Sequence, residues 1–243
     1  MSTRYPAPAL ENLPDDIRAR ILEVQEKSGF IPNVFLAFAR RPAEWRAFFA
    51  YHDALMLREE SHLTKGDREM IVTTTSAANQ CLYCVVAHGA ILRIYEKKPL
   101  VADQVAVNYR KADITPRQRA MLDFAMKVCE RSHEIEEADF APLHAHGFDD
   151  EDIWDIAAIT AFFGLSNRMA SFEHDAQPRV LPAGSHTETE KVRLNDSAPS
   201  GGDAKQAKIP AGAVEPALPG HWHRPLQGGR SSGTKSAKPG GVT

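Results

Sequence analysis

Three side chains that can carry redox or metal chemistry stand close together in the segment NQCLYCVVAHGA, residues 79–90. They are Cys81, Cys84 and His88, and the whole chain contains only three cysteines. Such a group can bind a metal ion, attach a haem, form a structural disulfide or act as a reactive pair of thiols. In a reducing compartment a close pair of cysteines is more often catalytic or metal-binding than structural.

Helical spacing would bring these three side chains onto one face. Two Cα atoms three residues apart on an α-helix are roughly 5 Å from each other, inside the range of about 4.4–6.8 Å that a disulfide accepts. His88 follows Cys84 by four residues, so its ring can approach the Cys84 sulfur. An imidazole beside a thiol favours the thiolate near neutral pH. Asn79 is the predicted N-cap, which would place both cysteines in the first turns of a helix.

Several uses of the CxxC motif compete on the residues alone. Covalent haem attachment needs a histidine directly after the second cysteine, where this chain has Val85. A structural zinc site would need Cys129 or Glu69 as a fourth ligand, and no second cluster at zinc-finger spacing supports it. A thioredoxin-type site would need a preceding strand. The CxxC motif alone is equally compatible with two buried cysteines packed as small apolar side chains and with a redox pair.

The first 180 residues show helix signals throughout. Apolar side chains, Ile17, Ile21, Leu22 and Val24 among them, recur at helical spacing between positions 15 and 28, and Gly29 is a typical stop. Helix starts are indicated at Pro42, at Thr64 with Asp67, at Thr115 with Pro116 and Gln118, and at Asp149 or Asp150. No stretch alternates as a half-buried strand would. The sequence therefore predicts an all-α domain, a compact multi-helix unit over residues 1–180.

The composition changes at about residue 181. Residues 181–243 contain ten of the fifteen glycines and seven of the sixteen prolines. Such a segment buries too little apolar surface to offset the entropy of ordering it. We predict a disordered Gly/Pro-rich C-terminal tail over residues 181–243.

Charge and hydropathy limit the classes of partner. The formal net charge is -3, and residues 1–180 carry 21 basic against 27 acidic side chains, which argues against nucleic acid as a partner. No basic start with an apolar core is present at the N-terminus, and the longest apolar run, from Ile156 to Leu165, is too short to span a membrane. We expect a cytoplasmic protein with no membrane partner.

The wider spacing around the motif resembles a known pattern. Glu69 is followed by eleven residues, then Cys81-Leu-Tyr-Cys84, then three residues and His88. This resembles the alkylhydroperoxidase D-like branch of the carboxymuconolactone decarboxylase superfamily, and its peroxidase-related members in particular. The segments IPNVFLAFARRP before the motif and FFGLSNRMA after it extend the resemblance over roughly residues 15 to 175.

The resemblance implies a thiol-dependent antioxidant peroxidase with no cofactor and no metal. Cys84 would attack a hydroperoxide, an organic one above all, and become a sulfenic acid. Cys81 would then close a redox-active disulfide, which an external dithiol of the lipoyl or thioredoxin-like kind reduces. Glu69 and His88 would form the proton relay. The resemblance also implies a homo-oligomer, a trimer or hexamer of helical subunits.

Residue-level reasoning agrees with part of this assignment. His88 is within reach of Cys84 but nearly two helical turns from Cys81, which favours Cys84 as the activated thiolate. The positive end of the helix favours Cys81 instead. We give more weight to the imidazole, because a base at hydrogen-bonding distance takes the proton itself.

One position departs from the family pattern. The residue before the second cysteine is Tyr83, where well-known members have a histidine of the relay. Tyrosine can donate a hydrogen bond as an auxiliary group, but it is a poor base near neutral pH. A general dithiol–disulfide oxidoreductase with little peroxidase activity, or a non-catalytic helical protein with a structural zinc, are therefore the alternatives.

Three other candidate residues carry weaker signals. Cys129 is expected to be buried and inert on a helix. His144 and His146 look like a metal pair, but two residues apart on a helix they would face different directions. We assign them to the surface or to a helix end.

Overall fold

The computed structural model describes residues 5–172, and the regular structure within them is helical. This confirms the all-α expectation. The predicted tail, residues 181–243, lies outside the described residues. The α-helices in chain order are α1 (Asp15–Ser28), α2 (Asn33–Phe38), α3 (Pro42–Met56), α4 (Lys65–Ala78), α5 (Leu82–Glu96), α6 (Val101–Asn108), α7 (Pro116–Arg131), α8 (Ala141–Ala145) and α9 (Asp150–Phe172). Single 3-10 turns connect them at Leu10–Asn12, Tyr109–Lys111, Ser132–Glu134 and Glu137–Asp139.

Local capping signals in the sequence account for the starts of the long helices. Thr64 accepts from the Asp67 N–H at 3.0 Å, and the Asp67 carboxylate accepts from the Thr64 N–H at 3.1 Å, which closes a capping box on α4. The Thr115–Gln118 pair does the same for α7. Asp149 caps α9 by accepting from the Asp152 N–H at 2.9 Å.

The α1 helix was predicted at its observed bounds, with one error in its buried face. Gly29 ends the helix in the left-handed conformation, φ 80°, which glycine adopts without steric cost. Ile17 and Ile21 are buried, but Leu22, which we expected on the same stripe, is 43% exposed. A residue next to Ile21 points about 100° away around the helix, so it cannot share that face.

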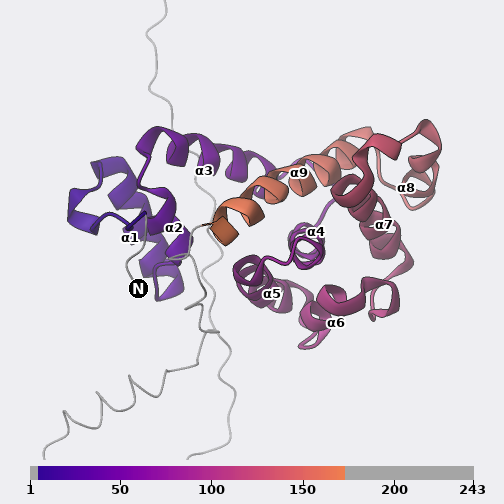
Figure 1. Ribbon diagram of the computed structural model, residues 1–243. Coiled ribbons are helices and arrows are strands. Elements are labelled where there is room, and N and C mark those ends of the chain that lie inside the picture. The colour runs from indigo at the N-terminus through magenta and orange to yellow at the C-terminus, as the bar shows by residue number, and fades with distance from the viewer. Residues whose placement is uncertain (1–4, 173–243) are drawn as a thin grey trace, which may run out of the picture. The chain divides into compact units, whose positions relative to one another are not determined.

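The α4 helix is the centre of the core. It contacts α5, α6, α7 and α9, and Figure 1 shows it end-on with these four helices around it. Its middle is buried all round, from Met70, Ile71 and Val72 to the polar residues Thr75 and Ser76. A helix enclosed in this way can hold a polar side chain such as Glu69 away from bulk water.

The helices α1, α2 and α3 form a smaller apolar cluster that joins the core through α3. Trp45 and Phe49 of α3 are buried in it together with Ile17 and Ile21 of α1. Phe48 links this cluster to α9, because its ring centroid lies 4.7 Å from that of Phe162. The α2 helix is thereby held near the C-terminal half of α9.

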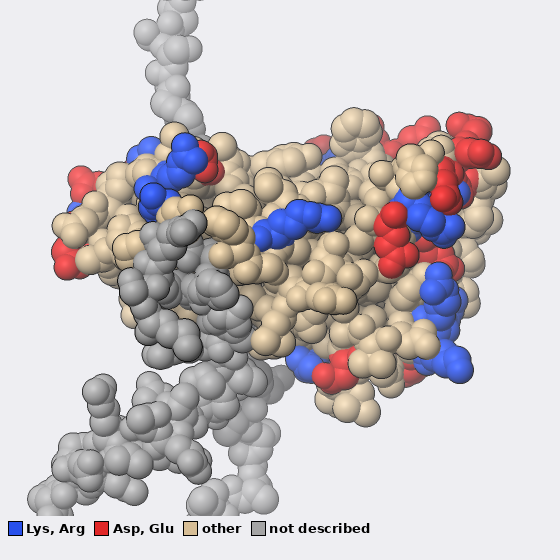
Figure 2. Space-filling model, viewed as in Figure 1, with Lys and Arg blue, Asp and Glu red and all other residues tan. Residues whose placement is uncertain are grey.

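The face that α9 crosses carries few charged side chains. Figure 2, in the same view as Figure 1, shows Lys, Arg, Asp and Glu gathered toward the periphery of the described part, with uncharged atoms over most of the middle. From Ile156 to Phe172 the only charged residue of α9 is Arg168. Among the helices of residues 5–172, none has both the length and the apolar character needed to span a membrane.

Candidate active site

The turn between α4 and α5 presents the first cysteine. Asn79 is the C-cap of α4, and Gln80 has φ 55°, a left-handed conformation that turns the chain into α5. The Cys81 N–H donates to the Ser76 carbonyl at 2.9 Å, which fixes the start of α5 to the end of α4. Our assignment of Asn79 as the N-cap was therefore wrong, and Cys81 itself is the N-cap of α5.

The two sulfur atoms lie in contact at this N-terminus. Their Sγ atoms are 2.8 Å apart, and the Cys84 backbone N–H donates to the Cys81 sulfur at 3.4 Å. Both cysteines are free thiols and are buried, with 1% and 2% of their surface exposed. A side-chain acceptor on the N-cap is the usual way to satisfy a backbone N–H in the first turn, and here a sulfur fills that position.

The pKa values of the two thiols are shifted in opposite directions. The pKa of Cys81 is lowered to about 6, chiefly by the hydrogen bond from the Cys84 thiol and further by the Cys84 backbone N–H, Ser171 and the nearby charge of His88, against the effect of burial. The pKa of Cys84 is raised, by its hydrogen bond to Cys81, by burial and by the Cys81 charge. At neutral pH the resting charge therefore lies on Cys81, and not on Cys84 as we expected from the position of the imidazole.

Glu69 and His88 form a hydrogen-bonded pair beside the thiols. His88 Nδ1 lies 2.7 Å from Glu69 Oε2, and both side chains are largely buried. The edge of the His88 ring packs against Phe163, with centroids 4.8 Å apart. No hydrogen bond joins the ring to either sulfur within residues 5–172. We expected the ring to lie at hydrogen-bonding distance from the Cys84 sulfur, and this was wrong, because the ring bonds to the carboxylate of Glu69 on α4 instead.

Donors from α9 complete the surroundings of the two sulfurs. Ser166 and Asn167 hydrogen-bond to Cys84 and lower its pKa. Ser171 does the same for Cys81. Ala170, on the same face of α9, packs directly against the cysteines. The segment FFGLSNRMA carried only the family resemblance, and its contacts with the cysteines could not be predicted from it, because they join residues more than eighty positions apart.

Tyr83 makes its hydrogen bond with α2. It is 6% exposed and packs against α2, where its hydroxyl accepts a hydrogen bond from the Val34 N–H. Burial raises the pKa of Tyr83 further above its ordinary value. Since Val34 belongs to the first turn of α2, the hydroxyl satisfies one of the backbone donors that a helix start leaves free.

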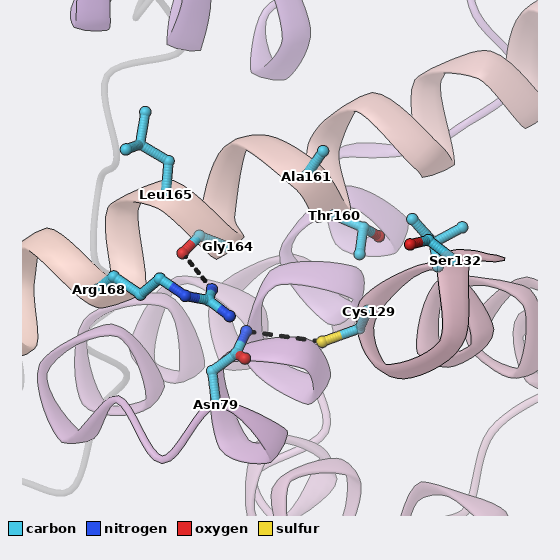
Figure 3. A pocket seen from close by; sticks show the side chains of 9 residues that line it. Asn79, Cys129, Ser132, Thr160, Ala161, Gly164, Leu165 and Arg168 are labelled. Atoms are coloured by element: carbon cyan, nitrogen blue, oxygen red, sulfur yellow. Dashed lines mark hydrogen bonds between the residues drawn. The ribbon is translucent and has the colours of Figure 1, made fainter.

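The third cysteine lies at a separate pocket. Cys129 is half-buried in the wall of a cavity of about 330 Å³ that includes residues of the α4–α5 turn, α7 and α9 (Figure 3). The Asn79 Nδ2 atom is 3.6 Å from the Cys129 sulfur. We expected Cys129 to be buried, but it is only half-buried. What burial there is raises the pKa of the Cys129 thiol, which disfavours the reactive thiolate.

The arrangement disfavours a zinc ion at the cysteines. Within the described residues the group whose ligand atoms lie close enough to hold a metal is His62, Asp149 and Asp152. Those three serve the start of α9, where His62 Nδ1 lies 2.8 Å from Asp152 Oδ2. His144 and His146 lie at the end of α8, and His144 pairs with Asp150 at 3.2 Å.

The geometry as a whole is suited to two-electron thiol chemistry. Two thiols in contact can close a disulfide with little backbone movement. One of them is a thiolate near neutral pH, and a carboxylate–imidazole pair stands close by to take and return protons.

Comparison with known proteins places the chain among relatives of the same architecture. Residues 42–99 match the model of the carboxymuconolactone decarboxylase family. A peroxidase-related protein with an alkylhydroperoxidase AhpD core from Ralstonia eutropha JMP134 is 75% identical, over 73% of this chain and 93% of that one, with a TM-score of 0.71. A peroxidase-related protein from Silicibacter sp. TM1040 is 44% identical, over 74% of this chain and 93% of that one, with a TM-score of 0.69.

A more distant structure shares the fold alone. The debrominase Bmp8 in complex with 2,3,4-tribromopyrrole is 19% identical, over 81% of this chain and 98% of that one, with a TM-score of 0.62. A search of curated proteins finds no match. The fold alone therefore accommodates more than one chemistry, and the side chains of the site must distinguish between them.

Proposed function

Because the chain belongs to the alkylhydroperoxidase D-like branch of the carboxymuconolactone decarboxylase superfamily, we propose that it is a thiol-dependent peroxidase. Its substrates are hydroperoxides, organic ones above all, and its redox centre is the Cys81–Cys84 pair. The observation that carries the proposal is the contact of the two free thiols at 2.8 Å, beside a Glu69–His88 pair joined at 2.7 Å. A site with only a packing role would not need a lowered thiol pKa or a buried carboxylate–imidazole pair.

In the proposed cycle Cys84 attacks first. Its proton passes to Cys81 across the sulfur–sulfur contact, and hydrogen bonds from Ser166 and Asn167 support the charge that remains on Cys84. The Cys84 sulfur then attacks the terminal peroxide oxygen and the O–O bond breaks. The alkoxide leaves as the alcohol with a proton from the Glu69–His88 pair, and Cys84 becomes a sulfenic acid.

Cys81 resolves the sulfenic acid. Its sulfur attacks the Cys84 sulfur, the S–O bond breaks, and the hydroxyl leaves as water with the Cys81 proton. Two thiols and one hydroperoxide thus give a disulfide, an alcohol and water. An external dithiol, of the lipoyl or thioredoxin-like kind, returns two electrons and two protons by thiol–disulfide exchange. A reducing compartment such as the cytoplasm would keep that dithiol available.

Mass spectrometry of the reduced, full-length protein tests this cycle. One equivalent of an organic hydroperoxide is expected to remove two hydrogens, mapped to Cys81 and Cys84, within minutes. The Cys81→Ser protein should trap a sulfenic acid on Cys84, and Cys129→Ser should behave like the parent protein. A Cys84→Ser protein that retains full thiol-dependent turnover of the peroxide would sink the proposal.

A second function is favoured by the lowered pKa of Cys81. A thiolate with a pKa of about 6 at a helix N-terminus is the nucleophile that attack on a disulfide requires. The protein would then be a general dithiol–disulfide oxidoreductase whose first nucleophile is Cys81. This alternative is tested by comparing the rates at which a hydroperoxide and a small disulfide oxidise the reduced protein. Much faster oxidation by the hydroperoxide would exclude it as the main activity.

A further inference from the structure

The α9 helix contributes a buried amide to the dithiol site. Asn167 is 1% exposed and sits one turn before Ala170, which packs against Cys81 and Cys84. A buried primary amide has two N–H donors and one carbonyl acceptor, and each of them needs a partner.

Two hydrogen bonds lock this amide to the end of α4. Asn167 Nδ2 donates to the Ser76 hydroxyl oxygen at 2.8 Å, and Asn167 Oδ1 accepts from Asn79 Nδ2 at 3.0 Å. The carbonyl of Ser76 also accepts the Cys81 N–H, so the same residue anchors both the amide and the first cysteine. The orientation of the Asn167 amide is thereby fixed relative to the turn that carries the thiols.

The Asn167 amide also interacts with the Cys84 thiol, as a hydrogen-bond partner that favours its thiolate form. With one hydrogen of Nδ2 on the Ser76 oxygen and Oδ1 accepting from Asn79, the amide has one N–H left for this interaction. This interaction opposes the influence of Cys81, which disfavours charge on Cys84. The amide therefore acts on the thiol that would otherwise remain protonated.

We propose that Asn167 is a positioning residue of the dithiol centre, which holds its amide against the Cys84 sulfur and readies that sulfur for nucleophilic attack. The proposal deepens the peroxidase function proposed above and rests on it for its place in the cycle. The hydrogen-bonding role of Asn167 itself is independent of the oxidant. Ser76 and Asn79 act through Asn167, because they fix the direction of its amide.

The test uses the full-length Cys81→Ser, Cys129→Ser protein, in which Cys84 is the only remaining thiol. The rate of alkylation by iodoacetamide is measured against pH, which gives the apparent pKa of Cys84 without any peroxide turnover. Asn167→Ala is expected to raise this pKa by about one unit, since a hydrogen bond to a charged group is lost. Asn167→Asp should raise it further, because a carboxylate repels the thiolate. Asn79→Ala, which removes the lock and keeps the amide, should raise it by less than Asn167→Ala.

An exposed asparagine provides the control. Asn108, at the end of α6, is replaced by Asp, which is expected to leave the Cys84 pKa unchanged. Circular dichroism checks that each variant is folded, and the near-isosteric Asn167→Asp serves if Asn167→Ala does not fold. A folded Asn167 variant whose Cys84 pKa equals that of the parent would overturn the proposal, even if its melting temperature fell. A shifted pKa in a protein that does not react with peroxide would leave the role of Asn167 intact and refute the peroxidase function instead.

Discussion

At the scale of single residues, the division of charge between Cys81 and Cys84 decides which sulfur is reactive at rest. Cys81 accepts hydrogen bonds from the Cys84 thiol and from the Cys84 backbone N–H, whereas the Cys84 thiol keeps its proton. The largest cause of the lowered pKa of Cys81 is thus the S–H group of Cys84. Removing that donor should therefore raise the pKa of Cys81 by more than the helix N-terminus alone lowers it.

A matched pair of variants tests this cause. In a Cys129→Ser background, Cys84→Ser keeps an O–H donor beside Cys81, and Cys84→Ala removes it. A thiolate is the form that reacts, so alkylation of Cys81 should rise with pH through a midpoint near 6 in the serine variant and fall away below it. In the alanine variant the midpoint should lie at least one unit higher. Equal midpoints in the two variants would show that the helix N-terminus, and not Cys84, lowers the pKa.

How much of the site could be read from the sequence depends on the distance between partners along the chain. Glu69, Cys81, Cys84 and His88 lie within one helix pair, and their spacing predicted that they belong together. Asn167 bonds to Asn79 and Ser76 across 88 and 91 positions, and no local pattern encodes such a contact. The roles of the two thiols depend on these long-range donors as well as on local spacing.

At the scale of elements, the predicted helices were set by local chemistry, and the error in the start of α5 arose at one unusual turn. The capping boxes at Thr64 and Thr115 and the stop at Gly29 are properties of a few adjacent residues, so α1, α4 and α7 could be predicted. The turn before α5 uses a left-handed Gln80 and a cysteine as N-cap. Glutamine is unusual in a left-handed conformation, and cysteine is unusual as an N-cap. We predicted Asn79 as the N-cap because asparagine is common at that position.

The contact between α5 and α2 gives Tyr83 a structural role. Its hydroxyl accepts from the Val34 N–H in the first turn of α2, and α2 supplies Val34, Ala37 and Phe38 to the apolar cluster around the cysteines. Both thiols are almost fully buried, and α2 covers one side of them. The hydroxyl of Tyr83 helps to hold α2 in place over the thiols.

The replacement Tyr83→Phe tests this role. It leaves the Val34 N–H without its acceptor, which should lower the free energy of unfolding by about 1 kcal/mol. Alkylation of the thiols should become several-fold faster as α2 opens more often, with no change in its pH midpoint. Tyr51→Phe, at a tyrosine that is 50% exposed, is the control. A ten-fold loss of peroxide oxidation in Tyr83→Phe would instead place the hydroxyl in proton transfer.

At the scale of the whole molecule, the outer face of α9 is the surface that we propose for assembly. Trp154, Leu165 and Phe172 are 71%, 54% and 59% exposed. They are eleven and seven residues apart, close to whole numbers of turns, so they form one stripe about 27 Å long. Exposed apolar surface of this extent is typical of subunit contacts. The sparse charge on this face agrees with that use.

The expected consequence is a homo-oligomer, a trimer or hexamer, that separates when a charge enters the stripe. Leu165→Asp buries an unpaired carboxylate in the contact, and an uncompensated charge of this kind is costly enough to shift the mass toward the monomer. Val107→Asp on α6 is the matched control, because Val107 is 86% exposed and lies off the stripe. Light scattering of the parent and both variants at equal concentration measures the mass. A monomeric parent protein would contradict the assembly itself, and a Leu165→Asp protein that keeps the mass of the parent would place the contact on another face.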